Sequence, residues 1–126
     1  MILLDTHVLL WTLAHPERLG ERTRSAMQAS AVFYSAVSIA EISIKHMLGR
    51  LQAPDDVAAQ AEEDGLQPLP LRPEHSGAVV EFPELIHHDP FDRLLLAQAH
   101  VERCGFLTVD GRLLKLGHDR VADARR

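Results

Sequence analysis

Short apolar runs alternate along this chain with longer stretches in which apolar and polar residues mix. The runs MILLD, VFYS, LQPLPL and FLTV are rich in leucine, β-branched or aromatic residues and are bounded by polar residues, which predicts buried strands. We expect strands at residues 1–5, 32–35, 66–71 and 106–109, and a last short strand at 121–122. The prolines of the third run suit an edge strand, because proline has no N–H to donate to a second neighbour.

The intervening stretches place apolar residues at helical spacing. We expect helices at residues 6–14, 20–31, 38–51, 54–65, 72–82 and 90–104. Strands separated by helices predict an α/β fold, with a parallel central sheet flanked by helices on both sides. Ligands of such folds bind beyond the carboxyl ends of the strands.

Length and composition limit the class of protein. A chain of 126 residues forms one domain, spanning 1–126. No apolar run approaches the roughly 20 residues that cross a bilayer, and the N-terminus carries no basic leader, so we expect neither a membrane partner nor a secretion signal. The lone Cys104 excludes an internal disulfide and fits a reducing, cytoplasmic location. The net charge of −5 argues against nucleic-acid binding unless acids bind a divalent metal and basic residues gather on one face.

Two aspartates stand at predicted strand ends. Asp5 follows the first strand and Asp110 follows the fourth, so both are expected at the carboxyl edge of the sheet. Each also has a purely structural explanation. Asp5 can cap the helix that follows it, and Asp110-Gly111 is a common turn pair.

Glu41 allows two interpretations. With Ser38 it matches the S-x-x-E capping box, and it can pair with Lys45 one turn later. Alternatively, it is a ligand. It lies on the margin of an apolar stripe, where a carboxylate is costly unless something pairs with it. The stripe consists of Val37, Ala40, Ile44, Met47, Leu48 and Leu51.

The segment HHDPFDRLLLAQA contains two acids with different predicted roles. Asp89 before Pro90 is a typical helix start. Asp92 then falls at the third helical position, where the helix dipole favours an acid. Apolar residues follow Asp92 at helical spacing, so its side chain is expected to point into the protein.

These positions together predict a metal site. Asp5, Glu41, Asp92 and Asp110 are expected on one edge of the sheet, where they would repel one another unless a cation is bound. Carboxylate oxygens with no cysteine, and no histidine in a spaced ligand pair, favour Mg²⁺ or Mn²⁺. Such an ion suits phosphodiester hydrolysis, because it orients the phosphate and activates water.

The stretches LLDTHVLLW, SAVSIAEISIK, HHDPFDRLLLAQA and LTVD resemble PIN-domain ribonucleases, and more narrowly the VapC toxins of bacterial toxin–antitoxin pairs. The resemblance spans nearly the whole chain, in the family's order and spacing. It implies a PIN-like fold and a Mg²⁺- or Mn²⁺-dependent endoribonuclease that leaves a 5′-phosphate and a 3′-hydroxyl. It also implies RNA as substrate, a homodimer and a cognate antitoxin that neutralises the toxin.

The resemblance carries over to particular residues. Asp5, Glu41, Asp92 and Asp110 match the family's acidic positions and so imply the catalytic, metal-binding set, with Glu41 binding directly or through water. Asp89 matches a frequent acid that is not a ligand. The frequent polar neighbours of the acids are matched by Thr6, Ser38 and Thr108.

Several other residues stay open on sequence alone. Arg93 and Lys45 can contact the scissile phosphate or form ordinary surface ion pairs. The basic cluster Arg18, Arg22 and Arg24 can follow an RNA backbone, face solvent or meet an acidic partner. Three histidines without a partner at ligand spacing are interpreted as surface or packing residues: His7, His87 and His88. The few aromatic residues are expected in the core or an interface, among them Trp11, Phe33 and Tyr34.

Three other functions compete with a toxin. The chain can be a PIN ribonuclease of RNA processing, or a PIN scaffold that binds without cutting. It can also be a phospho-acceptor receiver-like domain, which gathers acids around Mg²⁺ at strand ends. A receiver needs a lysine at the end of a late strand beside the acids, and this part of the chain offers only Lys115.

Overall fold

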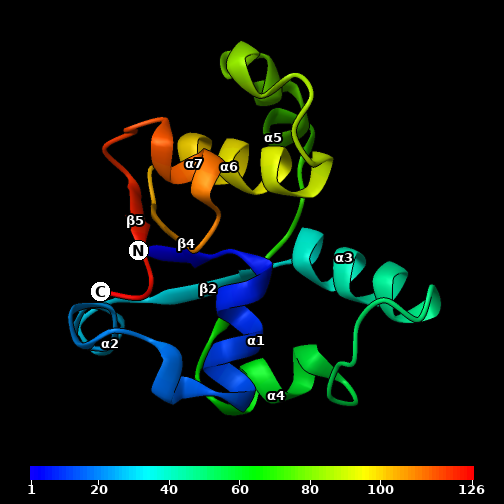
Figure 1. The fold of residues 1–126 in the computed structure, drawn as a ribbon, viewed down its shortest axis with the longest axis vertical. Coiled ribbons are helices and arrows are strands. Elements are labelled where there is room, and N and C mark those ends of the chain that lie inside the picture. Colours follow the sequence, from blue (N-terminus) through cyan, green and yellow to red (C-terminus); the bar gives the residue numbers. More distant parts are fainter.

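A five-stranded, all-parallel sheet lies between two layers of helices in the computed structural model, which describes all 126 residues (Figure 1). The strands are β1 (Ile2–Leu4), β2 (Val32–Ser35), β3 (Gln67–Leu69), β4 (Gly105–Thr108) and β5 (Val121–Asp123). Their order across the sheet is β3-β2-β1-β4-β5. The predicted parallel α/β fold is confirmed, and β3 is the edge strand that its prolines predicted.

Six of the seven helices follow the predicted segments, mostly with shorter bounds, and the short helix after Asp110 was not predicted. They are α1 (Thr6–Ala14), α2 (Glu21–Gln28), α3 (Ala36–Met47), α4 (Val57–Glu63), α5 (Pro73–Gly77), α6 (Pro90–Glu102) and α7 (Gly111–Lys115), with 3₁₀ turns η1 (Pro16–Arg18), η2 (Ala78–Glu81) and η3 (Pro83–Leu85). The predicted helix at 72–82 divides into α5 and η2. None of the helices is both long and apolar enough to cross a membrane.

The start of α3 differs from the prediction. Ser35 caps this helix by accepting a hydrogen bond from the backbone N–H of Val37, so the capping box between Ser38 and Glu41 is wrong. The helix begins earlier because β2 ends in a serine, which competes with Ser38 for the cap position. Ser38 and Glu41 consequently lie inside the helix and are buried.

The apolar stripe expected along α3 does not form the buried face of that helix. Ile44 is 46% exposed, Met47 86% and Leu48 59%, although Val37 of the same stripe is buried. The helix runs outward from the carboxyl end of β2, so only its first half packs against the sheet layers (Figure 1). Helical spacing correctly identified one face of α3 as apolar. It could not show that the rest of the protein covers only the first half of that face.

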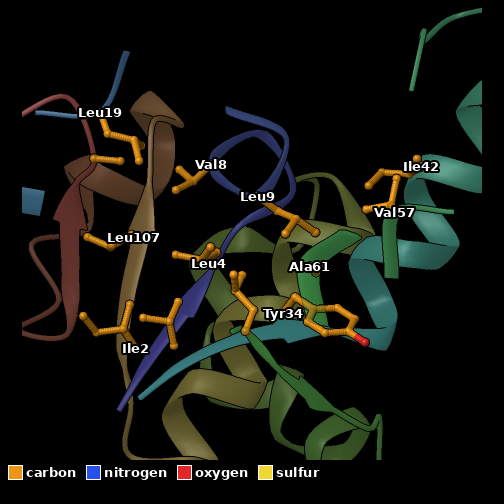
Figure 2. Packing of buried hydrophobic residues seen from close by; sticks show 13 residues of the cluster. Ile2, Leu4, Val8, Leu9, Leu19, Tyr34, Ile42, Val57, Ala61 and Leu107 are labelled. Atoms are coloured by element: carbon orange, nitrogen blue, oxygen red, sulfur yellow. The ribbon is translucent and has the colours of Figure 1, made fainter. Parts of the chain in front are cut away.

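Both faces of the central strand β1 are covered, as is usual for a parallel sheet. Leu4 packs on one face with Val8 and Leu9 of α1 and Ala61 of α4 (Figure 2). The neighbouring Leu3 points to the other face and joins a second cluster that includes residues of α6 and α7. These two clusters hold both helical layers against the sheet.

The strand order places a switch point between β1 and β4. From β1 the chain proceeds outward through β2 to β3, and it then returns to β4 on the other side of β1. The connections that leave β1 and β4 therefore diverge, and a crevice is left at their carboxyl ends. Asp5 and Asp110 stand immediately beyond these two strands.

Candidate active site

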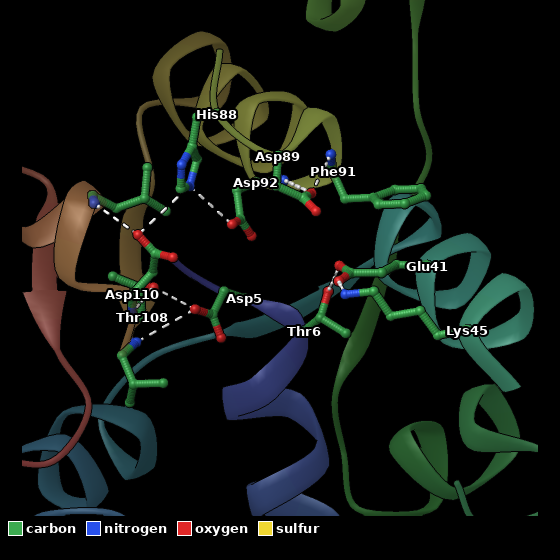
Figure 3. A network of polar contacts seen from close by, with 12 residues as sticks. Asp5, Thr6, Glu41, Lys45, His88, Asp89, Phe91, Asp92, Thr108 and Asp110 are labelled. Carbon is green, nitrogen blue, oxygen red and sulfur yellow. Dashed lines mark hydrogen bonds and ion pairs between the residues drawn. The ribbon is translucent and has the colours of Figure 1, made fainter. Parts of the chain in front are cut away.

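A polar cleft of about 600 Å³ opens at the carboxyl ends of the central strands. Val109 is the only hydrophobic residue that lines it. Five lining residues are acidic: Asp5, Glu41, Asp89, Asp92 and Asp110. The cleft thus brings together all four predicted acids, from α3, the α6 N-terminus and the ends of β1 and β4 (Figure 3).

Asp5 is both a helix cap and a buried acid of the cleft. One carboxylate oxygen accepts a hydrogen bond from the backbone N–H of Val8, at 2.8 Å, and so caps α1. The other accepts a hydrogen bond from the Thr108 hydroxyl. Burial raises the pKa of Asp5 above its ordinary value, although these hydrogen bonds oppose the rise. The capping and cleft interpretations of this residue therefore both hold.

Glu41 reaches the cleft from the first half of α3. Its carboxylate is only 6% exposed and accepts hydrogen bonds from the Thr6 hydroxyl at 2.6 Å and from Lys45 Nζ at 2.5 Å. The Ser38 hydroxyl oxygen lies 3.0 Å from that of Thr6. Thr6, one of the predicted supporting residues, thus anchors this acid directly, Ser38 contacts Thr6, and Lys45 neutralises the charge of Glu41. The hydrogen bond to Glu41 raises the pKa of Lys45, which keeps the amine charged.

Asp92 occupies the first turn of α6, and its position depends on Asp89. The Asp89 carboxylate accepts hydrogen bonds from the backbone N–H groups of Phe91 and Asp92, as expected for a cap. Desolvation and the negative charges of nearby acids, Asp89 first among them, raise the pKa of Asp92 to about 7. A carboxylate with such a pKa holds its proton at neutral pH about half the time.

Asp110 completes the acidic set from the other side of the cleft. It caps α7 by accepting a hydrogen bond from the backbone N–H of Leu113 at 3.0 Å. Its own N–H donates to the Thr108 hydroxyl, which in turn donates to Asp5. Thr108, the third predicted supporting residue, is fully buried and ties the two strand-end acids together.

A divalent cation fits this donor set. The acids are oxygen donors, and the other four lie close enough to raise the pKa of Asp92, which is the repulsion that a bound cation relieves. One atom each from His88, Asp92 and Asp110 lie within 4.8 Å of one another, the spacing of groups that share an ion. A divalent cation therefore suits this cleft because its oxygen and nitrogen donors have the right chemistry and lie close together.

Sequence analysis did not assign His7, His87, His88 and Arg112 to the cleft that they line, and among them His88 contacts two of the acids. Interpreted as a surface or packing residue, it instead points into the cleft, with its side chain only 8% exposed. Its Nε2 lies 3.0 Å from an oxygen of Asp92 and 3.6 Å from an oxygen of Asp110. The available signal was its position four residues before Asp92. That spacing carries no helical signal at its start, because His88 lies in a bend before α6 begins at Pro90.

The two candidate phosphate ligands differ in position. Lys45 lines the cleft, whereas Arg93 does not, and Arg93 Nη1 donates to the backbone carbonyl of Ile86 at 3.4 Å. The cluster Arg18, Arg22 and Arg24 lies on η1 and α2, toward the opposite end of the sheet from the cleft (Figure 1). The guanidinium of Arg18 stacks 5.6 Å from the centre of the Trp11 ring.

The receiver-like alternative lacks its required lysine. Lys115 is exposed on α7 and does not line the cleft. The lysine that does line it, Lys45, comes from α3 and pairs with Glu41. The arrangement that a phospho-acceptor domain needs, with a lysine from a late strand, is absent.

Comparisons with known proteins agree with this geometry. The family model of the PIN domain matches residues 2–119. The chain is 28% identical over 122 residues, covering 94% of each sequence, to Ribonuclease VapC22 of Mycobacterium tuberculosis. Its fold is similar to VapBC2 from Rickettsia felis bound to a promoter DNA fragment (TM-score 0.69, 13% identity, 98% of each chain). It is also similar to a toxin–antitoxin complex from Klebsiella pneumoniae (TM-score 0.66, 15% identity, 98% of each chain). The family model covers nearly all of the sequence, and the chain therefore belongs to the PIN-domain family.

Proposed function

We propose that this protein is a Mg²⁺- or Mn²⁺-dependent endoribonuclease that acts in the cytoplasm as the toxin of a VapBC-type pair. The observation that carries the proposal is the cleft in which Asp5, Glu41, Asp92 and Asp110 converge. The relative named Ribonuclease VapC22 and the similar toxin–antitoxin complexes support it. A cognate antitoxin and a homodimer belong to the same proposal.

The acids have distinct roles in this proposal. Asp5, Asp92 and Asp110 hold the cation, and Glu41 binds it directly or through water. The bound ion would position the scissile phosphate and make an attacking water more acidic. Thr108 fixes the direction of the Asp5 carboxylate, because its hydroxyl donates to that group. A fixed carboxylate loses less entropy when it binds an ion.

Lys45 is the basic residue best placed to contact the RNA backbone. Its side chain is 35% exposed at the cleft, and its amine stays charged through its contact with Glu41. A phosphate oxygen entering the cleft would meet this cation beside the acids. Arg93 would need a different side-chain conformation to reach the same phosphate, since its guanidinium now faces the Ile86 carbonyl.

Cleavage by the purified protein tests the proposal. With single-stranded RNA and Mg²⁺ or Mn²⁺ the wild type should produce fragments with 5′-phosphate ends, and a chelator should stop the reaction. Asp5→Asn and Asp92→Asn should abolish cleavage with unchanged circular dichroism. Asp119→Asn should cut normally, because Asp119 is an exposed acid outside the cleft. Wild-type, metal-dependent cleavage by the Asp5→Asn and Asp92→Asn proteins would refute the assignment.

Growth of cells that express the chain separates a toxin from an RNA-processing enzyme. Expression of the wild type should arrest growth, expression of Asp92→Asn should not, and co-expression of the cognate antitoxin should restore growth. Metal-dependent cleavage without growth arrest would contradict the toxin role and leave a processing ribonuclease.

A further inference from the structure

His88 brings a nitrogen atom into a cleft otherwise built from carboxylates. The residue lies in the turn before α6, and its ring is directed toward the acids (Figure 3). Its Nε2 is 3.0 Å from Asp92 Oδ2 and 3.6 Å from Asp110 Oδ1, and these atoms form the His/Asp group that can share one ion. The side chain is more than nine-tenths buried, so it is held in this direction.

The spacing of these three atoms is that of adjacent ligands around one ion. For metal–ligand distances of about 2.1 Å, neighbouring positions of an octahedron lie roughly 3 Å apart. Nε2 and Asp92 Oδ2 are already at that separation, and Asp110 Oδ1 is slightly farther. Imidazole nitrogen is a softer donor than carboxylate oxygen. It strengthens binding of first-row transition metals, increasingly from Mn²⁺ to Co²⁺, far more than binding of Mg²⁺.

From this geometry we infer that His88 is a further protein ligand of the cation, adjacent to Asp92 and Asp110 among the carboxylates, and gives the cleft a preference for Mn²⁺ and Co²⁺ over Mg²⁺. The inference deepens the proposed function, because it concerns the ion of the same site. The binding step forms a coordinate bond from the Nε2 lone pair of the neutral ring, whose proton then resides on Nδ1.

A different role for His88 predicts the opposite result. If the ring is only a positive counter-charge that occupies the cation's place among the acids, it competes with a metal ion. Its removal would then leave more negative charge available and tighten the binding of every divalent cation. The direction of the change in affinity therefore separates a ligand from a counter-charge.

Calorimetric titration of the full-length protein with MgCl₂, MnCl₂ and CoCl₂, without RNA, measures that direction. His88→Ala and His88→Gln should lower the affinity for Co²⁺ at least tenfold and the affinity for Mn²⁺ by less. The affinity for Mg²⁺ should change less than about threefold. His46→Ala is the matched control, since His46 is an exposed histidine that does not line the cleft. It should retain all three affinities. Unchanged or tighter Co²⁺ binding in both His88 variants overturns the inference.

Proton NMR of the Co²⁺-loaded wild type provides a test that does not depend on how the variants fold. A ligating imidazole should give a strongly shifted ring N–H signal that disappears in D₂O. The His46→Ala protein should keep this signal, and its absence from the wild type also overturns the inference. If the protein binds Co²⁺ through His88 but fails to cut RNA, the proposed function is wrong and the inference holds. If it cuts RNA while the His88 variants keep the wild-type Co²⁺ affinity, the reverse is true.

Discussion

Replacement of Asp92 by Asn should make the metal-free protein less sensitive to rising pH. The Asp92 carboxyl is 19% exposed and has a pKa of about 7, against an ordinary value of 3.8. Between these two values the folded protein keeps a proton that the unfolded chain has released. The free energy of unfolding therefore falls as the pH rises through this window, and the loss is complete above the folded-state pKa.

The size of this loss in the free energy of unfolding follows from the pH range over which the folded protein keeps the extra proton. From pH 5 to pH 7 one retained proton corresponds to at most about 2.7 kcal/mol, at 1.36 kcal/mol per pH unit. Partial exposure of the carboxyl to solvent screens the charges that raise its pKa, which reduces the expected loss to about 1–2 kcal/mol. This is a measurable share of the roughly 5–15 kcal/mol that stabilises an ordinary domain.

Urea unfolding at pH 5, 6, 7 and 8 in a chelating buffer provides the measurement. The free energy of unfolding of Asp92→Asn, relative to wild type, should increase by about 1–2 kcal/mol between pH 5 and pH 8. Titrations that both proteins share cancel in this difference. Asp119→Asn removes the same formal charge from an exposed position and should show a difference that does not change with pH. A pH-independent difference for Asp92→Asn as well would refute the argument from burial and charge repulsion.

Two further substitutions test contacts that hold the site and the fold. Thr108→Val keeps the shape of a fully buried side chain but removes its hydrogen bonds with Asp5 and with the Asp110 N–H. It should lower the free energy of unfolding in urea by about 1–3 kcal/mol, and a change below about 0.5 kcal/mol would contradict the role of these bonds. Gly20→Ala would place a Cβ 2.0 Å from the backbone carbonyl carbon of Arg126, so the tail must move and the melting temperature should fall by several degrees. Gly77→Ala, which meets nothing within 4 Å, should melt close to wild type, and equal melting of both variants would contradict the close contact at Gly20.

Local signals in the sequence were sufficient for most of the fold. Short apolar runs identified the strands, and Asp5 and Asp89 act as the helix caps that their positions predicted. Asp110, predicted at a turn, caps the short helix α7. These signals are reliable because strand burial and capping depend on residues only a few positions apart. Ser38 shows the limit of this reasoning. It matches a capping pattern, but Ser35 starts α3 three residues earlier.

The acids of the cleft could be predicted because the topology rule is general. Residues after the parallel strands β1 and β4 must meet at one edge of the sheet, and the switch point lies between these strands. The regular spacing of α6 likewise placed Asp92 on a buried side of its helix. Sequence therefore determined which acids can meet, and the resemblance to PIN domains selected the same set.

Tertiary structure alone decided the charge state and surroundings of those acids. The raised pKa of Asp92 depends on its burial and on carboxyls from three other segments, and the pairing of Glu41 with Thr6 joins residues 35 positions apart. His88 enters the site through an irregular turn, whose course no periodic pattern predicts. The sequence by itself determined the elements and the chemical type of the site, because these follow from local patterns. The distances that set the proton affinity of Asp92 and bring His88 to the acids arise only when distant segments pack together.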